Sequence, residues 1–332
     1  MIDRIKSLFT SLGLDWFLLA ILTMVLMAYF VPAPGMITQP LSLADLANYG
    51  VSGIFFFYGL KLNGQKLKMG LGNWKMHVVI QFTTFLIFPL LILIIKPFFG
   101  SPVAKELWLG IFFLAALPST VSSSVVMVSL AGGNIPAAIF NASISALIGV
   151  VITPLWIGLF LQSDAESFDM TGIAIKLTLQ VLVPVIIGIL LNKRLGYLAE
   201  LHKKALKFFD QLVILLIVYT SFCKSFAEHL FIGLNWYTLL VLATGMLLLF
   251  LATLIVMNRL SKALKFSRPD TITVMFCGSK KSLVHGTVMS GILFAGNPMA
   301  GILLLPLMFY HALQLIAASI LAKRLALSSN HH

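Results

Sequence analysis

The chain has 332 residues, of which 59% are hydrophobic and only 10% charged, whereas about 25% are charged in a typical soluble protein. This composition excludes a soluble globular protein, because the apolar residues far exceed what one core could bury. The formal net charge is +12, but the cationic residues form short clusters between apolar segments, which is how membrane orientation is encoded. Nucleic-acid binding is therefore not expected, and the lipid bilayer is the expected environment.

Ten apolar segments have about the 20 residues that a helix needs to cross a bilayer. The first follows Arg4 and Lys6 like a signal peptide, but it is long and ends at Val31 to Pro34 without an A-x-A-like cleavage site. We therefore interpret it as a helix, and predict an all-α membrane protein with ten transmembrane helices. The predicted spans cover residues 15–32, 44–61, 77–98, 106–131, 135–162, 171–192, 207–228, 235–258, 269–295 and 300–322.

The distribution of positive charge predicts how these spans are oriented. Positive charge resists translocation and collects in cytoplasmic loops. If the N-terminus, the C-terminus and the loops after the even-numbered spans are cytoplasmic, seventeen of the 23 lysines and arginines lie on that side. We therefore expect both termini to be cytoplasmic.

The fourth and ninth predicted spans are interrupted by polar residues. Ten spans divide into two sets of five, and an odd number per set inverts the second set relative to the first. The fourth span is interrupted from Pro118 to Ser124 and the ninth from Cys277 to Ser282, so each interrupted span is the fourth of its half. The sequence therefore predicts an inverted repeat of five plus five helices with broken helices four and nine.

The interruption of span four predicts a helix break beside a polar cavity. Pro118 lacks a backbone donor and disfavours helix at Leu117. Non-helical chain at membrane depth persists only where protein or trapped water satisfies it. The nearby hydroxyls could coordinate an ion or a substrate, although a single serine between helices often serves close packing alone. The candidate hydroxyls are Thr120, Ser122, Ser123 and Ser124.

Lys280 and Lys281 lie near the centre of span nine, where a lysine costs roughly 2.5 to 3.5 kcal/mol. All 11 acidic residues fall in loops or near the ends of spans, so neither amine has an evident counter-charge. A neutral amine or a bound anion would relieve the cost, and both favour a transport site. The alternative for either lysine alone is a stem that reaches water, or an amine that caps the carbonyl end of a half-helix.

Other polar residues within the spans are candidates for lining the same cavity. Asn141 and Ser145 are four residues apart and share one helix face, as do Lys281 and His285. For an intramembrane histidine, a hydrogen bond between helices is the alternative to a proton relay. No cofactor or metal cluster is expected. Gln81, Asn141, Ser145, Ser279, Ser282 and His285 complete the candidate set.

The residues of the two interruptions carry a family resemblance that extends over essentially all ten spans. The Ser/Thr run after Pro118, its Leu-Ala-Gly-Gly-Asn ending at Asn134 and the Thr153-Pro154 pair resemble the bile acid:sodium symporter family. The segment from Phe276 to Leu283 is similar to its divergent SBF-like branch, which occurs in bacteria and within animal solute carrier family 10.

This resemblance implies two groups of helices and a place for the substrate. A panel domain would hold the spans at about 15–61 and 171–228, and a core domain those at about 77–162 and 235–322. In that fold the broken helices cross, and the substrate binds beside the crossing. The bacterial branch implies a location in the inner membrane.

The family's better-known branch couples uptake of steroid-like organic anions to two sodium ions, and its sodium ligands carry over only in part. Gln81 and Ser124 match two of these ligands, so a Na⁺ site at these residues is one expectation. The span-nine glutamate is replaced by Phe276 and the following glutamine by Lys280. A fixed ammonium repels sodium, so a proton, or a built-in cation in place of sodium, is the other expectation.

The sequence thus predicts a secondary transporter, and not an enzyme, that carries a small organic anion by alternating access, with symport as the expected mode. One alternative is a membrane scaffold or regulator that keeps the fold without translocating anything; the missing sodium ligands favour it, and the costly lysine pair argues against it. An intramembrane hydrolase that uses Ser279 or Ser282 with a neighbouring lysine would lack an orienting third group. The sequence carries no signal for an oligomeric state.

Overall fold

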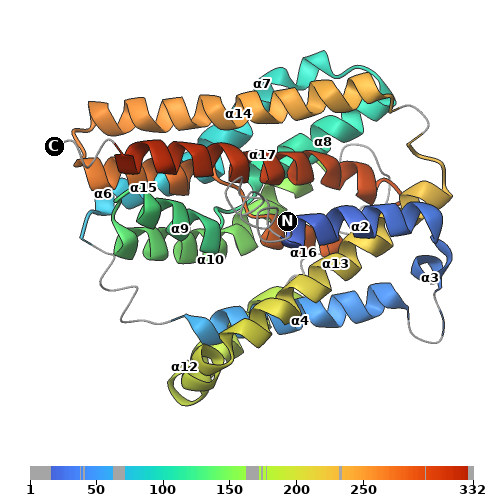
Figure 1. The fold of residues 1–332 in the computed structure, drawn as a ribbon. Helices are drawn as coiled ribbons and strands as arrows, with labels where there is room; N and C mark the ends of the chain where they lie inside the picture. Colours follow the sequence, from blue (N-terminus) through green and yellow to red (C-terminus); the bar gives the residue numbers. More distant parts are fainter. Residues whose placement is uncertain are drawn as a thin grey trace, which may run out of the picture.

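The structure is a computed structural model that describes residues 16–37, 39, 42–62, 72–161, 172, 175–176, 178–231, 234–295 and 297–327. Within these residues every regular element is a helix (Figure 1), which confirms the all-α class. In chain order they are α2 (Trp16–Phe30), α3 (Ala33–Met36), α4 (Leu43–Lys61), α6 (Trp74–Phe82), η1 (Thr83–Ile87), α7 (Phe88–Ile95), η2 (Lys96–Phe98), α8 (Pro102–Ala116), α9 (Ser122–Leu130), α10 (Ile135–Leu161), η3 (Thr178–Leu182), α12 (Val183–Leu201), α13 (Lys203–Ala227), α14 (Trp236–Ala263), α15 (Arg268–Ser279), α16 (Leu283–Leu293) and α17 (Ala300–Leu327).

Six helical stretches of the described chain are long and apolar enough to cross a membrane. Large apolar side chains are exposed on the outside of the bundle, among them Leu190, Phe98 and Phe30, each at 73% or more. Such an apolar exterior suits lipid and not water, so the protein is an integral, multi-pass membrane protein. The six stretches are Trp74–Phe98, Ile135–Phe160, Thr178–Leu201, Lys203–Ala227, Trp236–Ala263 and Ala300–Leu327.

Two further apolar segments are each divided into a pair of short helices. Residues 117–121 separate α8 from α9, and residues 280–282 separate α15 from α16. The four halves have 15, 9, 12 and 11 residues, and each is too short to cross a bilayer alone. Both predicted interruptions are therefore real breaks in the helices.

Several helices are longer than the predicted spans. The helix α12 continues to Leu201 and α17 to Leu327, whereas their spans were expected to end at residues 192 and 322. Charged residues such as Lys193 and Arg194 lie inside α12. The apolar pattern marks where lipid ends, but the helical hydrogen bonds continue into water beyond that point.

A π-turn in the third apolar segment leaves two backbone carbonyls without their usual helical partners. In η1 the N–H of Phe88 donates to Thr83 O, five residues back, and so bypasses Thr84 O. The next residue, Pro89, has no N–H to offer to Phe85 O. The indole N–H of Trp156 on α10 donates to Phe85 O at 2.8 Å. The carbonyl of Thr84 is left for another donor, which the site supplies.

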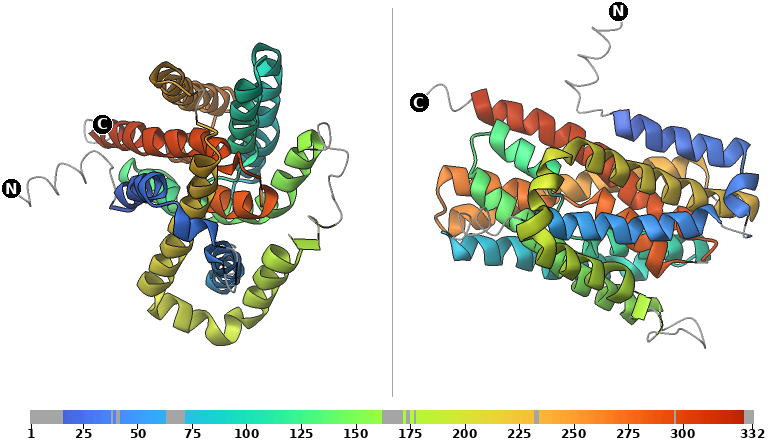
Figure 2. Two further views of the ribbon diagram at one scale, coloured as in Figure 1. Left: turned by 90° about the vertical axis from the view of Figure 1, so that its right-hand side faces the viewer. Right: turned by 90° about the horizontal axis from the view of Figure 1, so that it is seen from below.

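The helices pack as two neighbouring groups. In Figure 2, α4, α12 and α13 lie along one side of the bundle, and α8, α14 and α17 lie along the other. The helices α4 and α12 approach closely at Gly59 and Gly188, where a Cβ on Gly59 would overlap the carbonyl of Val185. Small residues at a contact allow membrane helices to bring their backbones together. The two interrupted helices contact the second group, and α16 also packs against α13 and α4 of the first.

Candidate functional site

The two helix breaks meet in space. The backbone N–H of Ser282 donates to the carbonyl of Pro118 at 3.0 Å, which joins the second break to the first. Leu117 (φ −71°, ψ 152°) and Lys280 (φ −90°, ψ 141°) are both extended, so the chain leaves the helix at each point. Pro118 explains the first break, because helix is disfavoured at the preceding residue. At the second, the Ser282 hydroxyl caps the N-terminus of α16 by accepting from His285 N–H.

Lys281 is fully buried and its amine is bound by three backbone carbonyls. The Nζ atom lies 2.9 Å from Thr84 O, 2.7 Å from Ala115 O and 2.8 Å from Leu117 O. It also lies 4.2 Å from the centre of the Phe88 ring, a cation–π distance. The carbonyl of Thr84 is the one that the π-turn bypasses, and the other two belong to the end of α8. All three protons of the ammonium therefore have an acceptor.

Two further backbone groups at the end of α8 have side-chain partners. The Thr153 hydroxyl donates to Ala116 O at 2.7 Å, and Ser119 N–H donates to the Ser145 hydroxyl at 2.9 Å. A Cβ on Gly149 would lie 2.8 Å from the Pro118 ring, so α10 touches the break directly. Because a freed carbonyl in hydrocarbon is costly, these contacts explain how the break is tolerated.

Helix α17 holds the backbone of the second break. The Gln314 side chain accepts from Lys281 N–H at 2.9 Å and donates to Lys281 O at 2.8 Å. The Tyr310 hydroxyl donates to Ser279 O at 2.6 Å, at the end of α15. These two side chains replace the hydrogen bonds that the interrupted helix lost.

The neighbouring lysine, Lys280, is in a different situation. It is 0% exposed, and within the described residues its Nζ has no hydrogen-bond partner. Neither Lys280 nor Lys281 forms an ion pair with any carboxylate that the structure describes. Cys277 and His311 lie within electrostatic range of the Lys280 amine. Lys280 thus carries buried donors that have no acceptor among the described residues.

Several buried oxygen atoms near the breaks are likewise unsatisfied. Among the described residues, the hydroxyls of Thr84, Ser119 and Thr287 have no hydrogen-bond partner. Thr84 and Ser119 flank the carbonyls that hold Lys281, and Thr287 lies on α16, one turn past the second break. Buried polar groups in a native protein normally find a partner. Unpaired hydroxyls near the two breaks indicate places for water or for a polar ligand.

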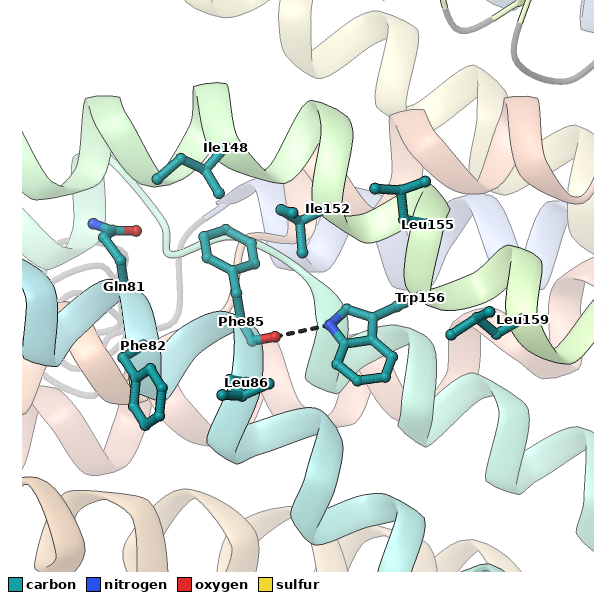
Figure 3. A pocket seen from close by; sticks show the side chains of 9 residues that line it. All are labelled: Gln81, Phe82, Phe85, Leu86, Ile148, Ile152, Leu155, Trp156 and Leu159. Atoms are coloured by element: carbon teal, nitrogen blue, oxygen red, sulfur yellow. Dashed lines mark hydrogen bonds between the residues drawn. The ribbon is translucent and has the colours of Figure 1, made fainter.

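An apolar groove lies beside the polar residues, between the third and fifth apolar segments. It has a volume of about 540 Å³, and Figure 3 shows Gln81 near one end and Trp156 and Leu159 toward the other. The amide of Gln81 donates to Asn141 O at 3.1 Å, and Asn141 in turn contacts His77 Nδ1 at 2.8 Å. Gln81 Oε1 has no partner among the described residues. The polar end of the groove therefore combines an open acceptor with an apolar wall.

The candidate residues that were named from the sequence fall into local pairs. Thr120 and Ser123 contact each other at 3.2 Å, and Ser124 donates to Phe276 O at 3.3 Å across the crossing. The contacts that the structure describes do not bring Gln81 and Ser124 together. The side chain of Ser122 lies outside the described part of the structure.

In the second break, Ser279 donates to Met275 O, and Ser282 contacts His285 Nδ1 at 2.9 Å. His285 also lies edge-on to the rings of Phe55 and Tyr58 on α4, with ring centres 6.1 and 5.7 Å away. Ser279 therefore bonds within its own helix, whereas His285 reaches the other group of helices.

Sequence reasoning missed Thr84, whose freed carbonyl accepts from the Lys281 amine, and Thr153 and Tyr310, whose hydroxyls donate to freed carbonyls. A partial signal was available for Thr84, because Pro89 in the middle of an apolar span predicts an irregular turn before it. For Thr153 and Tyr310 there was no local signal, since their partners are distant in the chain.

An all-helical membrane protein in which two broken helices meet around buried amines has the construction of a membrane transporter. Comparison with known proteins agrees, and the chain belongs to the SBF-like CPA transporter family, whose model matches residues 15–327. The predicted family is thereby confirmed. As a member of a transporter family, the protein is a transporter and not an enzyme.

Three relatives cover nearly the whole chain. An uncharacterized protein of Pseudomonas aeruginosa is 40% identical over 312 residues, which are 94% of this chain and 93% of the relative. The Escherichia coli K12 protein named "Putative symporter YfeH" is 34% identical over 311 residues, covering 94% and 92%. Sodium/bile acid cotransporter 7-B of Xenopus laevis is 32% identical over 319 residues, covering 95% and 92%.

Proposed function

We propose that this protein is a symporter that carries a small organic anion, and that the anion binds where the two broken helices meet. The observation that carries the proposal is the Lys280 amine, which is fully buried and has no hydrogen-bond partner in the described chain. An unpaired buried ammonium is costly. A bound anion would supply the missing acceptor, so the site is complete only when it is occupied.

Two of the relatives' names support a carrier of this kind. One contains the word symporter, and the other the words sodium/bile acid cotransporter. A bile acid is an amphipathic organic anion, and the groove beside Gln81 has an apolar wall with a polar end. We infer that the substrate joins an anionic group to an apolar body.

The binding residues that we propose lie on both sides of the crossing. Lys280 would supply the main positive charge, because all three protons of Lys281 have carbonyl acceptors. The described side chains that would line the rest of the cavity are Thr120, Ser123, Ser124, Gln81, Asn141, Ser145, Ser279, Ser282 and His285. For the coupling ion we consider Na⁺, through Gln81 and Ser124, and H⁺.

We further propose ten transmembrane segments in an inverted repeat, in which one group of helices rocks against the other around the crossing. In support, each broken helix is followed by a long helix, α10 or α17. The panel domain would contain α2, α4, α12 and α13, and the core domain α6 to α10 and α14 to α17, including both broken helices. We expect a bacterial plasma membrane, since two of the relatives are bacterial, with both termini in the cytoplasm.

Uptake into liposomes containing the purified protein tests the proposal. We expect accumulation of at least one labelled anion from a panel of bile acids and smaller carboxylates under an imposed gradient of Na⁺ or of H⁺. Lys280→Ala should abolish it, whereas Lys262→Ala, which removes an exposed lysine of α14, should not. Uptake that responds to neither gradient would contradict symport, and full activity of Lys280→Ala would contradict the anion site.

A non-transporting scaffold is the remaining alternative, and ligand-dependent melting separates it from a transporter. A ligand that binds only the native state stabilises it by RT ln(1 + L/Kd), where L is the concentration of free ligand. The melting temperature of a transporter should therefore keep rising with the logarithm of the substrate concentration above Kd. A scaffold should show no such shift with any member of the panel.

A further inference from the structure

The three carbonyls around Lys281 form a small cation-binding cradle, made of Thr84 O, Ala115 O and Leu117 O. Each of the three is freed by an irregularity of the chain, the first by the π-turn in η1 and the others by the end of α8. The Phe88 ring adds the negative face of an aromatic system on another side. Carbonyl oxygens and a ring face are ligands for a cation of any kind.

A protein with this cradle needs a positive charge in it. The C-terminal end of a helix carries a partial negative charge, because its last carbonyls have no N–H partner. At membrane depth water is scarce, and an unsatisfied carbonyl is costly. Removing the cation without a substitute would leave three unsatisfied oxygens next to one another.

The Lys281 ammonium fills the cradle at distances of 2.7 to 2.9 Å. Its backbone is fixed at both ends by Gln314, so the amine is anchored in position. The lysine is supplied by the second break, whereas two of the carbonyls come from the end of the first. The Lys281 amine therefore connects the two broken helices, at the kind of unwound carbonyls and half-helix C-terminal ends that coordinate coupling cations in other transporters.

We propose that the Lys281 ammonium is a built-in cation that takes the place of a bound coupling cation at the crossing, so that this transporter works without binding Na⁺ there. The consequence of this proposal is that the coupling ion is H⁺, and this consequence rests on the proposed transport function. The occupancy of the cradle itself is a property of the folded protein and is tested without any substrate.

Melting of the purified protein in different chloride salts tests the cradle. Lys281→Ala leaves the carbonyls empty, and it should melt at higher temperature in NaCl or methylammonium chloride than in choline chloride at equal ionic strength. The gain in melting temperature should grow with the logarithm of the Na⁺ or methylammonium concentration once that concentration exceeds Kd. The wild type, Lys281→Arg and the neighbouring Lys280→Ala should melt alike in the three salts, because their cradles hold a cation.

Two results would overturn the proposal. The first is a Lys281→Ala protein that is insensitive to the choice of cation. The second is a wild type or Lys280→Ala that melts at higher temperature in Na⁺ with the same concentration dependence as Lys281→Ala, since the cradle would then not be the binding place.

If Lys281→Ala does not fold, uptake by the wild type tests whether transport requires Na⁺. The uptake rate at a fixed membrane potential and pH gradient should be unchanged when Na⁺ is replaced by choline on both sides. A rate that falls tenfold or more without Na⁺ would refute the built-in cation. Absence of uptake for every anion tested would instead count against the proposed function, and the melting comparison would still report on the cradle.

Discussion

The Gln314 side chain binds both backbone polar groups of Lys281: it accepts from the N–H at 2.9 Å and donates to the carbonyl at 2.8 Å. The amide thus imitates the pairing of two backbone groups at a point where the helix is absent. Gln314 is itself fully buried on α17. An uninterrupted helix packed beside a broken one therefore supplies the hydrogen bonds that the break removes.

Replacing Gln314 by methionine should destabilise the protein strongly. Methionine has a similar length but cannot pair with Lys281 N–H and O, and each buried group left unpaired costs about 1–3 kcal/mol. We expect a lower melting temperature and reduced uptake. Ser319→Ala is the control in the same helix, because the Ser319 hydroxyl contacts only Met127 Sδ at 3.9 Å among the partners described for it. Equal melting of the two variants would contradict this role of Gln314.

Gly149 should not tolerate a side chain. A Cβ at this position would lie 2.8 Å from the ring atoms of Pro118, in the first break. Gly149→Ala should therefore cost about 1–3 kcal/mol through overpacking, which outweighs the roughly 1 kcal/mol by which alanine favours a helix over glycine. The control is Gly245→Ala on α14, where a Cβ would meet no described atom within 4 Å. That variant should melt at the same temperature as the wild type or higher.

The two breaks could be predicted from the sequence because each is caused by residues within the break itself. Pro118 cannot continue a helix, and Lys280 with Lys281 cannot remain in hydrocarbon without polar surroundings. The all-α class and the six long apolar helices of the described chain followed from the lengths of the apolar segments. Several helix ends differ from the predicted ends, because helices such as α12 continue beyond the lipid.

The different situations of the two lysines could not be predicted in the same way. The amine of Lys281 is bound because Thr84 O is free, and that depends on a π-turn in a helix far away in the chain. Neighbouring residues on an extended chain point to opposite sides, so one of the two had to point away from the cradle. The sequence does not show which one. The sequence left open that either lysine caps the carbonyl end of a half-helix. The contacts show that Lys281 does so, at the end of α8.

Substituting methionine at the two lysines should have opposite effects on stability. Lys281→Met leaves three carbonyls without their donor and should lower the free energy of unfolding by about 3 kcal/mol or more. Lys280→Met replaces an amine without a described partner by an apolar chain of similar length, and should raise it by about 0.5–2 kcal/mol. Melting temperatures in detergent check both. Destabilisation by Lys280→Met would mean that its amine has a structural partner.

The contact between Tyr58 on α4 and α10 should influence how readily the two groups of helices separate. The Tyr58 hydroxyl donates to Ser143 O at 2.8 Å, and a bond of this kind contributes about 0.5–1.5 kcal/mol. Tyr58→Phe should therefore favour the separated conformation several-fold. The rate at which a water-soluble reagent alkylates the cysteine of a Ser143→Cys variant reports how often the two groups of helices separate. The background is low, because Cys223 and Cys277 are fully buried. Tyr49→Phe, at an exposed position of the same helix, is the control, and equal labelling of both variants would show that the bond does not restrain the motion.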